Sequence, residues 1–139
     1  MKKHAATLLI LMVSALPALV NAQAARGTIK ATIPFEFVVA GKTMPAGAYT
    51  IQALGDGATS LLISNRQGSA YALPFSTQSV QPAVGTQLVF HCYGDRHFLA
   101  AISREGSKWG YQMSESKLEN ELRAQNVVER EETLAAAAN

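Results

Sequence analysis

The chain of 139 residues has little of several residue types on which protein chemistry commonly depends. Its single cysteine excludes an internal disulfide framework and any site built from several thiolates. Charged residues make up only 16% of the chain and apolar residues 48%, which excludes an intrinsically disordered protein. No stretch matches a glycine-rich phosphate loop, a nucleophile elbow or a zinc-protease helix. The length is that of one domain.

The longest apolar run lies at the N-terminus and is typical of an export signal. Two lysines precede the uncharged residues 5–20, and small residues follow them. A basic head, a short apolar middle and a small-residue exit are the three parts of a secretory signal peptide. The run is shorter than the ~20 residues that a membrane-spanning helix needs. We expect residues 1–24 to be a signal peptide cleaved after Ala22 or Ala24, and the mature chain to be secreted or periplasmic without a transmembrane anchor.

Signal removal changes the charge of the chain. Loss of the two N-terminal lysines lowers the number of Lys and Arg residues from 12 to 10, which equals the 10 acidic residues. A neutral mature chain has no electrostatic surface for nucleic acid. Residues 25–114 carry a net charge of +3 and residues 115–139 one of −3. This acidic tail could dock on the basic body or on a neighbouring copy, although an exposed helix face accounts for the same pattern.

The first half of the mature chain alternates between apolar and polar side chains with a period of two. The alternation covers residues 28–33, 35–39, 49–53 and 60–64. Turn-forming residues separate these runs at residues 40–42, 45–47, 55–57 and 65–68. Short strands and turns at this spacing are typical of an antiparallel sandwich or barrel. No helical periodicity intervenes before residue 114, which argues against a parallel sheet.

The clearest local pattern is a hairpin within residues 86–103. Gly94 and Asp95 lie between two apolar runs and predict a two-residue type II′ turn. The register that follows from this turn gives the cross-strand pairs Cys92–His97, Phe90–Leu99 and Leu88–Ala101. Both faces of the hairpin are largely apolar, so we expect it to be central and covered on both sides.

After Tyr111 the pattern becomes helical. Ser116 and Glu119 have the spacing of a helix capping box. Two pairs of opposite charge four residues apart also favour a helix, namely Lys117/Glu121 and Glu119/Arg123. Beyond Gln125 the sequence is compatible with an edge strand, a continued helix or a frayed end.

These patterns together predict an all-β fold: an antiparallel sandwich or flattened barrel of about seven or eight short strands, with a C-terminal helix. The expected division is a signal peptide at residues 1–24, the β-domain at residues 25–113, and the helix and tail at residues 114–139. A chain of this size buries about two-thirds of its unfolded surface, so it should fold without a disulfide or a metal.

Residues 33–51 are IPFEFVVAGKTMPAGAYTI and residues 93–99 are YGDRHFL. Together these stretches resemble a family of small secreted β-rich proteins of Acidobacteria-type bacteria. The resemblance covers most of the mature chain and implies a secreted β-rich domain, but no particular activity. A basic residue often stands in that family where Cys92 stands here, so the resemblance implies no thiol-based function.

Cys92 and His97 are the first candidates for catalysis, because the predicted hairpin makes them cross-strand neighbours. A cysteine nucleophile also needs an orienting Asn or Asp and an oxyanion pocket. The expected apolar neighbours, Phe90 and Leu99, raise the pKa of a thiol rather than lower it. A buried structural cysteine accounts for the same pattern, so we expect no catalytic residue and no enzyme.

A metal site would need one carboxylate beside Cys92 and His97. His91 points to the opposite face of the hairpin, and Asp95 is better explained as a turn residue. We therefore expect no metal ligands and no cofactor.

Three aromatic residues are the candidates for ligand binding. Trp109 and Tyr111 are two residues apart on an expected strand and should share a face, and Tyr93 could extend the surface. Rings in a row can stack on a sugar or a peptide, although the sequence favours burial of Trp109 and Tyr111 under the helix, because large aromatic residues dominate small cores.

The predicted function is that of an exported, non-catalytic β-domain with an interaction or cell-envelope structural role. Its partner would be a second copy or an envelope protein, bound through a sheet edge or the acidic tail. The alternative is a binding module for a small, carbohydrate-type ligand that uses Trp109, Tyr111 and Tyr93.

Overall fold

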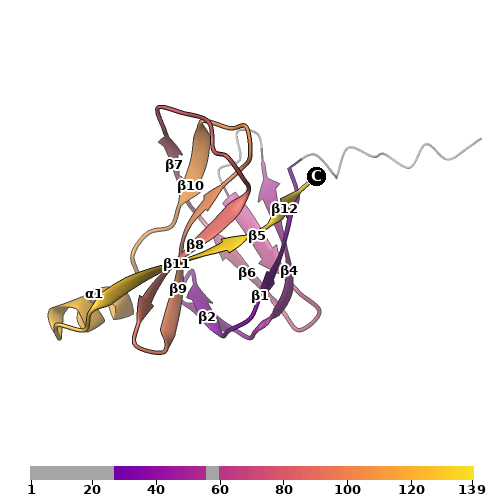
Figure 1. Cartoon of the computed structure of the whole chain (residues 1–139). Coiled ribbons are helices and arrows are strands. Elements are labelled where there is room, and N and C mark those ends of the chain that lie inside the picture. Colours follow the sequence, from indigo (N-terminus) through magenta and orange to yellow (C-terminus); the bar gives the residue numbers. More distant parts are fainter. Residues whose placement is uncertain (1–26, 56–59) are drawn as a thin grey trace, which may run out of the picture.

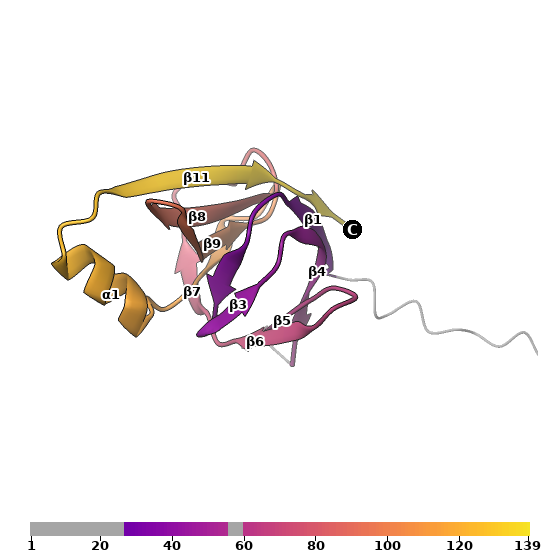
Figure 2. The same ribbon diagram turned by 90° about the horizontal axis from the view of Figure 1, so that it is seen from below.

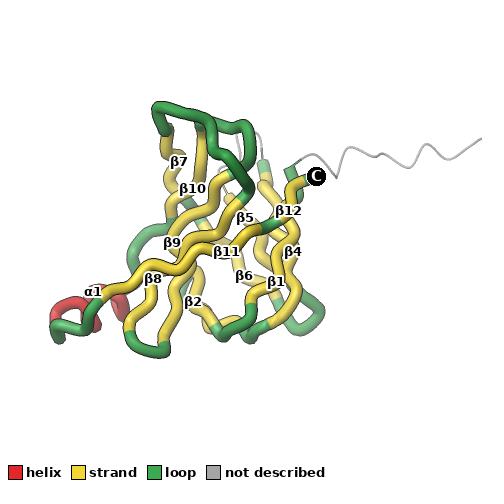
Figure 3. The backbone as a smooth tube through the Cα atoms, viewed as in Figure 1, coloured by secondary structure: helices red, strands yellow, loops and turns green. Residues whose placement is uncertain are grey.

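The computed structural model describes residues 27–55 and 60–139 as an all-β fold of two sheets and one short helix (Figures 1 and 3). The predicted signal peptide and most of the predicted turn at residues 55–57 lie outside the described residues. The first sheet has the strand order β12-β1-β4-β5-β6. Its strands are β1 (Ile29–Ile33), β4 (Gly47–Leu54), β5 (Ser60–Ser64), β6 (Ser69–Ala72) and β12 (Ala137–Ala138).

The second sheet has the main order β11-β8-β9-β10-β7, and β2 joins it beside β9 and carries β3. Its strands are β2 (Phe37–Val39), β3 (Lys42–Met44), β7 (Phe75–Gln78), β8 (Gln87–Tyr93), β9 (Arg96–Ser103), β10 (Trp109–Gln112) and β11 (Glu129–Ala135). The pairs are antiparallel except for the contact of β2 with β9, which is parallel. The predicted all-β class is confirmed. The described residues form twelve strands rather than seven or eight, because tight turns split the chain into short segments.

Four passages of the chain cross between the sheets, and two of them join edge strands of one sheet to edge strands of the other. The chain crosses from β6 to β7 through residues 73–74, and from β11 to β12 through Ala136. Figure 2 shows β11 lying along β8 and continuing into β12 beside β1. The two sheets are thereby linked on both sides, which gives the sandwich the character of a flattened barrel.

The core lies between the sheets and follows the predicted alternation. In β1 the side chains of Ile29, Ala31 and Ile33 are buried, and the residues between them are exposed. Aromatic rings fill the centre, where Phe37 meets Phe90 edge-to-face at 5.7 Å. Burial of these apolar rows is the main favourable term for the fold.

The β8–β9 hairpin has the predicted register near its turn and a different one farther away. Gly94 has a φ of 63°, as the first position of a type II′ turn requires, and Cys92 pairs with His97. A bulge between Val89 and Phe90 then shifts the register. The prediction that Leu88 pairs with Ala101 is therefore wrong, because Leu88 pairs with Ile102. The extra residue turns Ile102 toward the core beside Leu88.

The outer face of this hairpin lies against α1 (Lys117–Ala124), whose capping box is present as predicted. The Ser116 hydroxyl accepts from the Glu119 amide, and the Glu119 carboxylate accepts from the Ser116 amide. Glu119 is 4% exposed and lies 3.5 Å from His91 of β8. Glu119 thus contacts His91 rather than pairing with Arg123, which bonds instead to Glu115 and Glu129.

The last segment of the chain is neither a continued helix nor a frayed end. β11 pairs with β8 over seven residues, and β12 pairs with β1. Residues 129–138 are therefore strands of the two sheets and do not form a tail separate from the β-domain.

Candidate functional site

A cleft of about 420 Å³ lies between the two sheets, away from the β8–β9 turn. One wall comes from β1, β4 and β5, and the other from β7, β10 and the loop before β10. The innermost lining is aliphatic and consists of Ile29, Ile51 and Leu61, which are all buried. The volume is in the range of pockets that bind small molecules, about 300–1,000 Å³.

Trp109 and Tyr111 line this cleft together. Gly110 separates them on β10, so their rings share a face as the spacing predicts. Trp109 is 57% exposed at the rim, whereas Tyr111 is half-buried and packs against the core. Gly110 leaves room at this point, because a Cβ there would lie 3.0 Å from the Ile102 carbonyl oxygen.

Tyr93 does not belong to the cleft. It is 2% exposed beside the β8–β9 turn, and its hydroxyl bonds to Arg123 and Glu129. The separation follows from register, because β10 pairs with the end of β9 that is far from that turn. Burial, the largest cause, raises the pKa of Tyr93.

The polar rim of the cleft contains a residue that the sequence patterns do not single out. Arg104 lies in the lining, and its Nη2 donates to the Asn139 carbonyl oxygen at 3.0 Å. Ser76 and Ser107 add hydroxyl groups to the lining. These residues come from separate loops and strands, so no local pattern could have grouped them.

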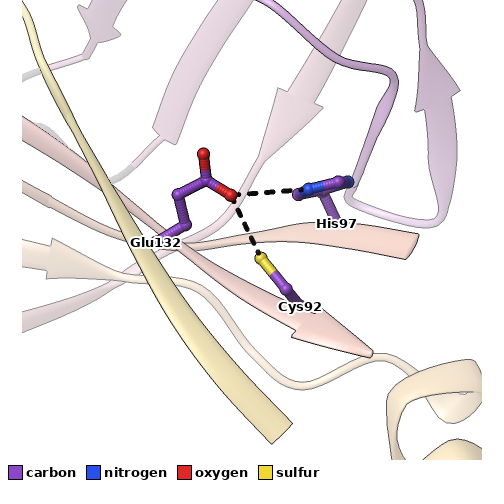
Figure 4. Close-up of side chains that lie close together, drawn as sticks. All are labelled: Cys92, His97 and Glu132. Atoms are coloured by element: carbon purple, nitrogen blue, oxygen red, sulfur yellow. Dashed lines mark hydrogen bonds and ion pairs between the residues drawn. The ribbon is translucent and has the colours of Figure 1, made fainter. Parts of the chain in front are cut away.

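A second candidate site consists of Cys92, His97 and Glu132 (Figure 4). Glu132 Oε2 lies 3.6 Å from His97 Nε2 and 3.9 Å from Cys92 Sγ. Figure 4 shows the three side chains turned toward one another from three strands. The predicted hairpin places Cys92 beside His97, but it does not predict that Glu132 lies beside this pair. Glu132 reaches the pair because β11 lies beside β8 on the opposite side from β9.

Aromatic rings cover one side of this cluster. Phe35 stacks on the His97 imidazole with the ring centres 3.8 Å apart, and meets Phe90 edge-to-face at 5.0 Å. Cys92 is 1% exposed. Burial raises the pKa of the Cys92 thiol, the negative charge of Glu132 raises it further, and Arg130 opposes both. A thiol that stays protonated is a poor nucleophile, so this geometry does not favour cysteine catalysis.

A third polar group fastens the helix to the sheet. His91 Nδ1 lies 3.5 Å from Glu119 and 3.6 Å from Glu129. Arg123 donates to Glu115, Glu129 and the Tyr93 hydroxyl. His91 Nδ1 makes no hydrogen bond within the described residues, but the bonds from Arg123 join α1, β8 and β11, so we assign this group a structural role.

Comparisons with protein-family models, with curated proteins and with solved structures found no match. Within residues 27–55 and 60–139, no helix has both the length and the apolar character needed to cross a membrane. The function is therefore inferred from the geometry of the cleft and of the Cys92 cluster.

Proposed function

We propose that this chain is a non-catalytic binding module that takes a small, largely apolar ligand with an anionic group into the cleft beside Trp109. The observation that carries the proposal is the 420 Å³ cleft, lined by two of the three aromatic residues that the sequence patterns single out. A concave, mostly apolar pocket with a few polar groups is the usual form of a small-molecule site.

The lining of the cleft supports an apolar class of ligand. Ile29, Ile51 and Leu61 offer no hydrogen-bond partners at the inner end, where the hydroxyl groups of a sugar would lose water without replacement. An acyl chain or an aromatic ring has no hydrogen bonds to water to lose there, and burial of its apolar surface favours binding. The geometry thus favours an apolar ligand over the carbohydrate expected from the aromatic residues alone.

The positive charge of Arg104 is the reason for proposing an anionic group on the ligand. The Arg104 guanidinium has five N–H donors, and Asn139 accepts from only one nitrogen. The remaining donors can hold a carboxylate at the rim while the apolar part lies between the sheets. The proposed ligand class is therefore a medium-chain or aromatic carboxylic acid.

Trp109 is the only tryptophan of the chain, so its fluorescence reports directly on the cleft. We expect decanoate to change this fluorescence with saturation, and decanol and cellobiose to act more weakly. Arg104→Gln should weaken decanoate more than decanol, and Tyr111→Ala should weaken both. Tyr71→Ala is the matched control, because Tyr71 is an exposed aromatic residue of β6 outside this cleft.

Two results would contradict this function. One is the absence of any saturable response to decanoate. The other is wild-type binding by both the Arg104→Gln and the Tyr111→Ala variants. A response to cellobiose alone would instead support the carbohydrate module.

The proposed place of action is the periplasm or the outside of the cell, as predicted from residues 1–24. Expression in a bacterial host with cell fractionation tests this. N-terminal sequencing of the exported product should begin at Gln23 or Ala25, and an uncleaved chain in the cytoplasm would refute the export.

A second candidate function, assembly through a sheet edge, is supported by β7. All four residues of β7 are exposed, and among the described residues β7 pairs only with β10. Residues 67–90 contain no charged side chain, and exposed apolar side chains near the edge include Leu73, Phe75 and Val80. An uncharged edge leaves backbone groups free for pairing with another strand.

Size-exclusion chromatography with light scattering tests this assembly. We expect the wild-type mass to rise with concentration, and Phe75→Lys to keep the chain monomeric by placing a charge on the edge. Val128→Lys changes another exposed apolar residue, outside β7, and serves as the control. A wild-type chain that is monomeric at every concentration would exclude assembly.

A further inference from the structure

We propose that Cys92, His97 and Glu132 form a three-ligand site for a thiophilic divalent cation, with Zn²⁺ as the probe. The three ligand atoms all lie within 4.8 Å of one another, although the residues come from three adjacent strands of one sheet. This site is separate from the cleft and does not depend on the function proposed for it.

The distances between the ligand atoms are close to those of a loaded site. In a tetrahedral zinc centre, bonds of about 2.0–2.3 Å place neighbouring ligand atoms about 3.3–3.6 Å apart. Here the His97 Nε2–Glu132 Oε2 distance is 3.6 Å and the Cys92 Sγ–Glu132 Oε2 distance is 3.9 Å. Shifts of a few tenths of an ångström would bring these two pairs to zinc-bound spacing, and the third pair, Cys92 Sγ and His97 Nε2, lies within 4.8 Å.

The donor set determines the kind of metal. A thiolate sulfur and an imidazole nitrogen favour zinc and related transition metals, whereas Mg²⁺ and Ca²⁺ prefer oxygen ligands only. One thiolate and one carboxylate balance the charge of a divalent ion. Three protein ligands leave a fourth position for water, as in zinc sites that remain open.

His97 is positioned for a ligand role by packing rather than by hydrogen bonds. Within the described residues its Nδ1 is buried without a hydrogen-bond partner, and its Nε2 lies 3.6 Å from Glu132 Oε2. Stacking on Phe35 fixes the plane of the ring. The Nε2 atom is therefore held beside Glu132 at little further entropic cost.

Glu132 on β11 is the most exposed of the three ligands. The Cys92 side chain is buried, whereas the Glu132 side chain is 38% exposed. An ion reaching Glu132 from solvent would next meet His97 and Cys92. As the Sγ–metal bond forms, the thiol proton is released to water.

Arg130 is the group that opposes binding. It pairs with Cys92 across β8 and β11, and its side chain interacts with the thiol. Because Arg130 is exposed, its guanidinium can move into solvent when an ion enters. Removal of this positive charge should therefore strengthen binding.

Titration of the tag-free full chain with Zn²⁺ and with Co²⁺ tests the site. We expect one equivalent to bind, and the Co²⁺ form to show thiolate-to-metal charge-transfer absorption. Glu132→Gln and His97→Gln should each lower the affinity at least ~10-fold, a loss already typical of removing an outer-shell partner. Cys92→Ser should abolish the charge-transfer band, and Arg130→Gln should bind Zn²⁺ more tightly than the wild type.

His91→Gln is the matched control, because His91 lies on the same strand as Cys92 and on the other face. It should bind Zn²⁺ as the wild type does. Circular dichroism of each variant separates loss of binding from loss of folding. A Co²⁺ form without a thiolate band, or wild-type affinity in both Glu132→Gln and His97→Gln, would overturn the proposal.

Discussion

Arg123 joins the helix, the β8–β9 hairpin and the last long strand through one guanidinium. It donates to both oxygens of Glu115, to Glu129 and to the Tyr93 hydroxyl. The bonds from Arg123 are the largest cause that holds the pKa of Glu115 below its ordinary value of 4.5. The free energy of unfolding therefore depends on pH through the Glu115–Arg123 pair.

The sign of this pH dependence follows from the lowered pKa. A carboxyl group with a lower pKa in the folded state stabilises the fold above its unfolded pKa, and this contribution is lost as the pH falls through the folded pKa. We expect the urea midpoint to fall on acidification below 4.5, and the fall to be smaller for Glu115→Gln. Glu131→Gln removes an exposed carboxylate outside this network and should leave the pH dependence unchanged. Identical pH profiles for Glu115→Gln and the wild type would contradict the assignment.

At the scale of residues, some contacts within the candidate sites can be predicted from the sequence and others cannot. Cys92 and His97 are brought together by a two-residue turn, so their contact follows from local chemistry. Glu132 is 40 residues from Cys92, and only the pairing of β11 with β8 brings it there. Trp109 and Tyr111 share a face because strand side chains alternate, whereas the opposite wall of the cleft is set by packing between the sheets.

At the scale of elements, α1 depends on its N-terminal cap. The helix has eight residues, which is too short to be stable in isolation. Ser116→Ala removes the hydroxyl that accepts from the Glu119 amide and should lower the free energy of unfolding by about 1 kcal/mol. Ser114→Ala, an exposed serine outside the cap, is the control. Chemical denaturation measures both, and equal stabilities would refute the role of the cap.

The position of β10 depends on Gly110. Gly110→Ala would place a Cβ 3.0 Å from the Ile102 carbonyl oxygen and 3.4 Å from the Thr77 hydroxyl. We expect this crowding to cost about 1–3 kcal/mol of stability and to widen the cleft beside Trp109. Gly85→Ala meets nothing within 4 Å and should be nearly neutral. Equal denaturation midpoints for the two variants would show that β10 tolerates the displacement.

The element boundaries also show why part of the fold escapes prediction. Residues 28–33 and 49–53 alternate clearly and form strands as expected. The sequence of β11, EREETLA, is rich in glutamate, which is disfavoured in strands, and its strand form comes from pairing with β8. The bulge between Val89 and Phe90 also comes from tertiary packing rather than from local sequence. Burial of Ile102 in the core compensates for the interrupted hydrogen bonds between β8 and β9.

At the scale of the whole molecule, the buried thiol reports on opening of the fold. Cys92 is 1% exposed, so it should not form a disulfide between native chains. We expect Ellman's reagent to modify the native chain at least ~10³-fold more slowly than the urea-unfolded chain, because reaction requires local or global opening. Rapid modification under native conditions, or a covalent dimer after mild oxidation, would contradict the burial.

The crossing from β11 to β12 also constrains biosynthesis. Within the described residues, numbers 129–138 complete both sheets, and a ribosome adds them after the ten strands that precede them. A nascent chain that ends before residue 129 leaves β8 and β1 as unprotected edges, with the apolar rows between them poorly enclosed. Cooperative folding must therefore await the C-terminal segment, and translation products truncated there would be targets for proteolysis and aggregation rather than partially active molecules.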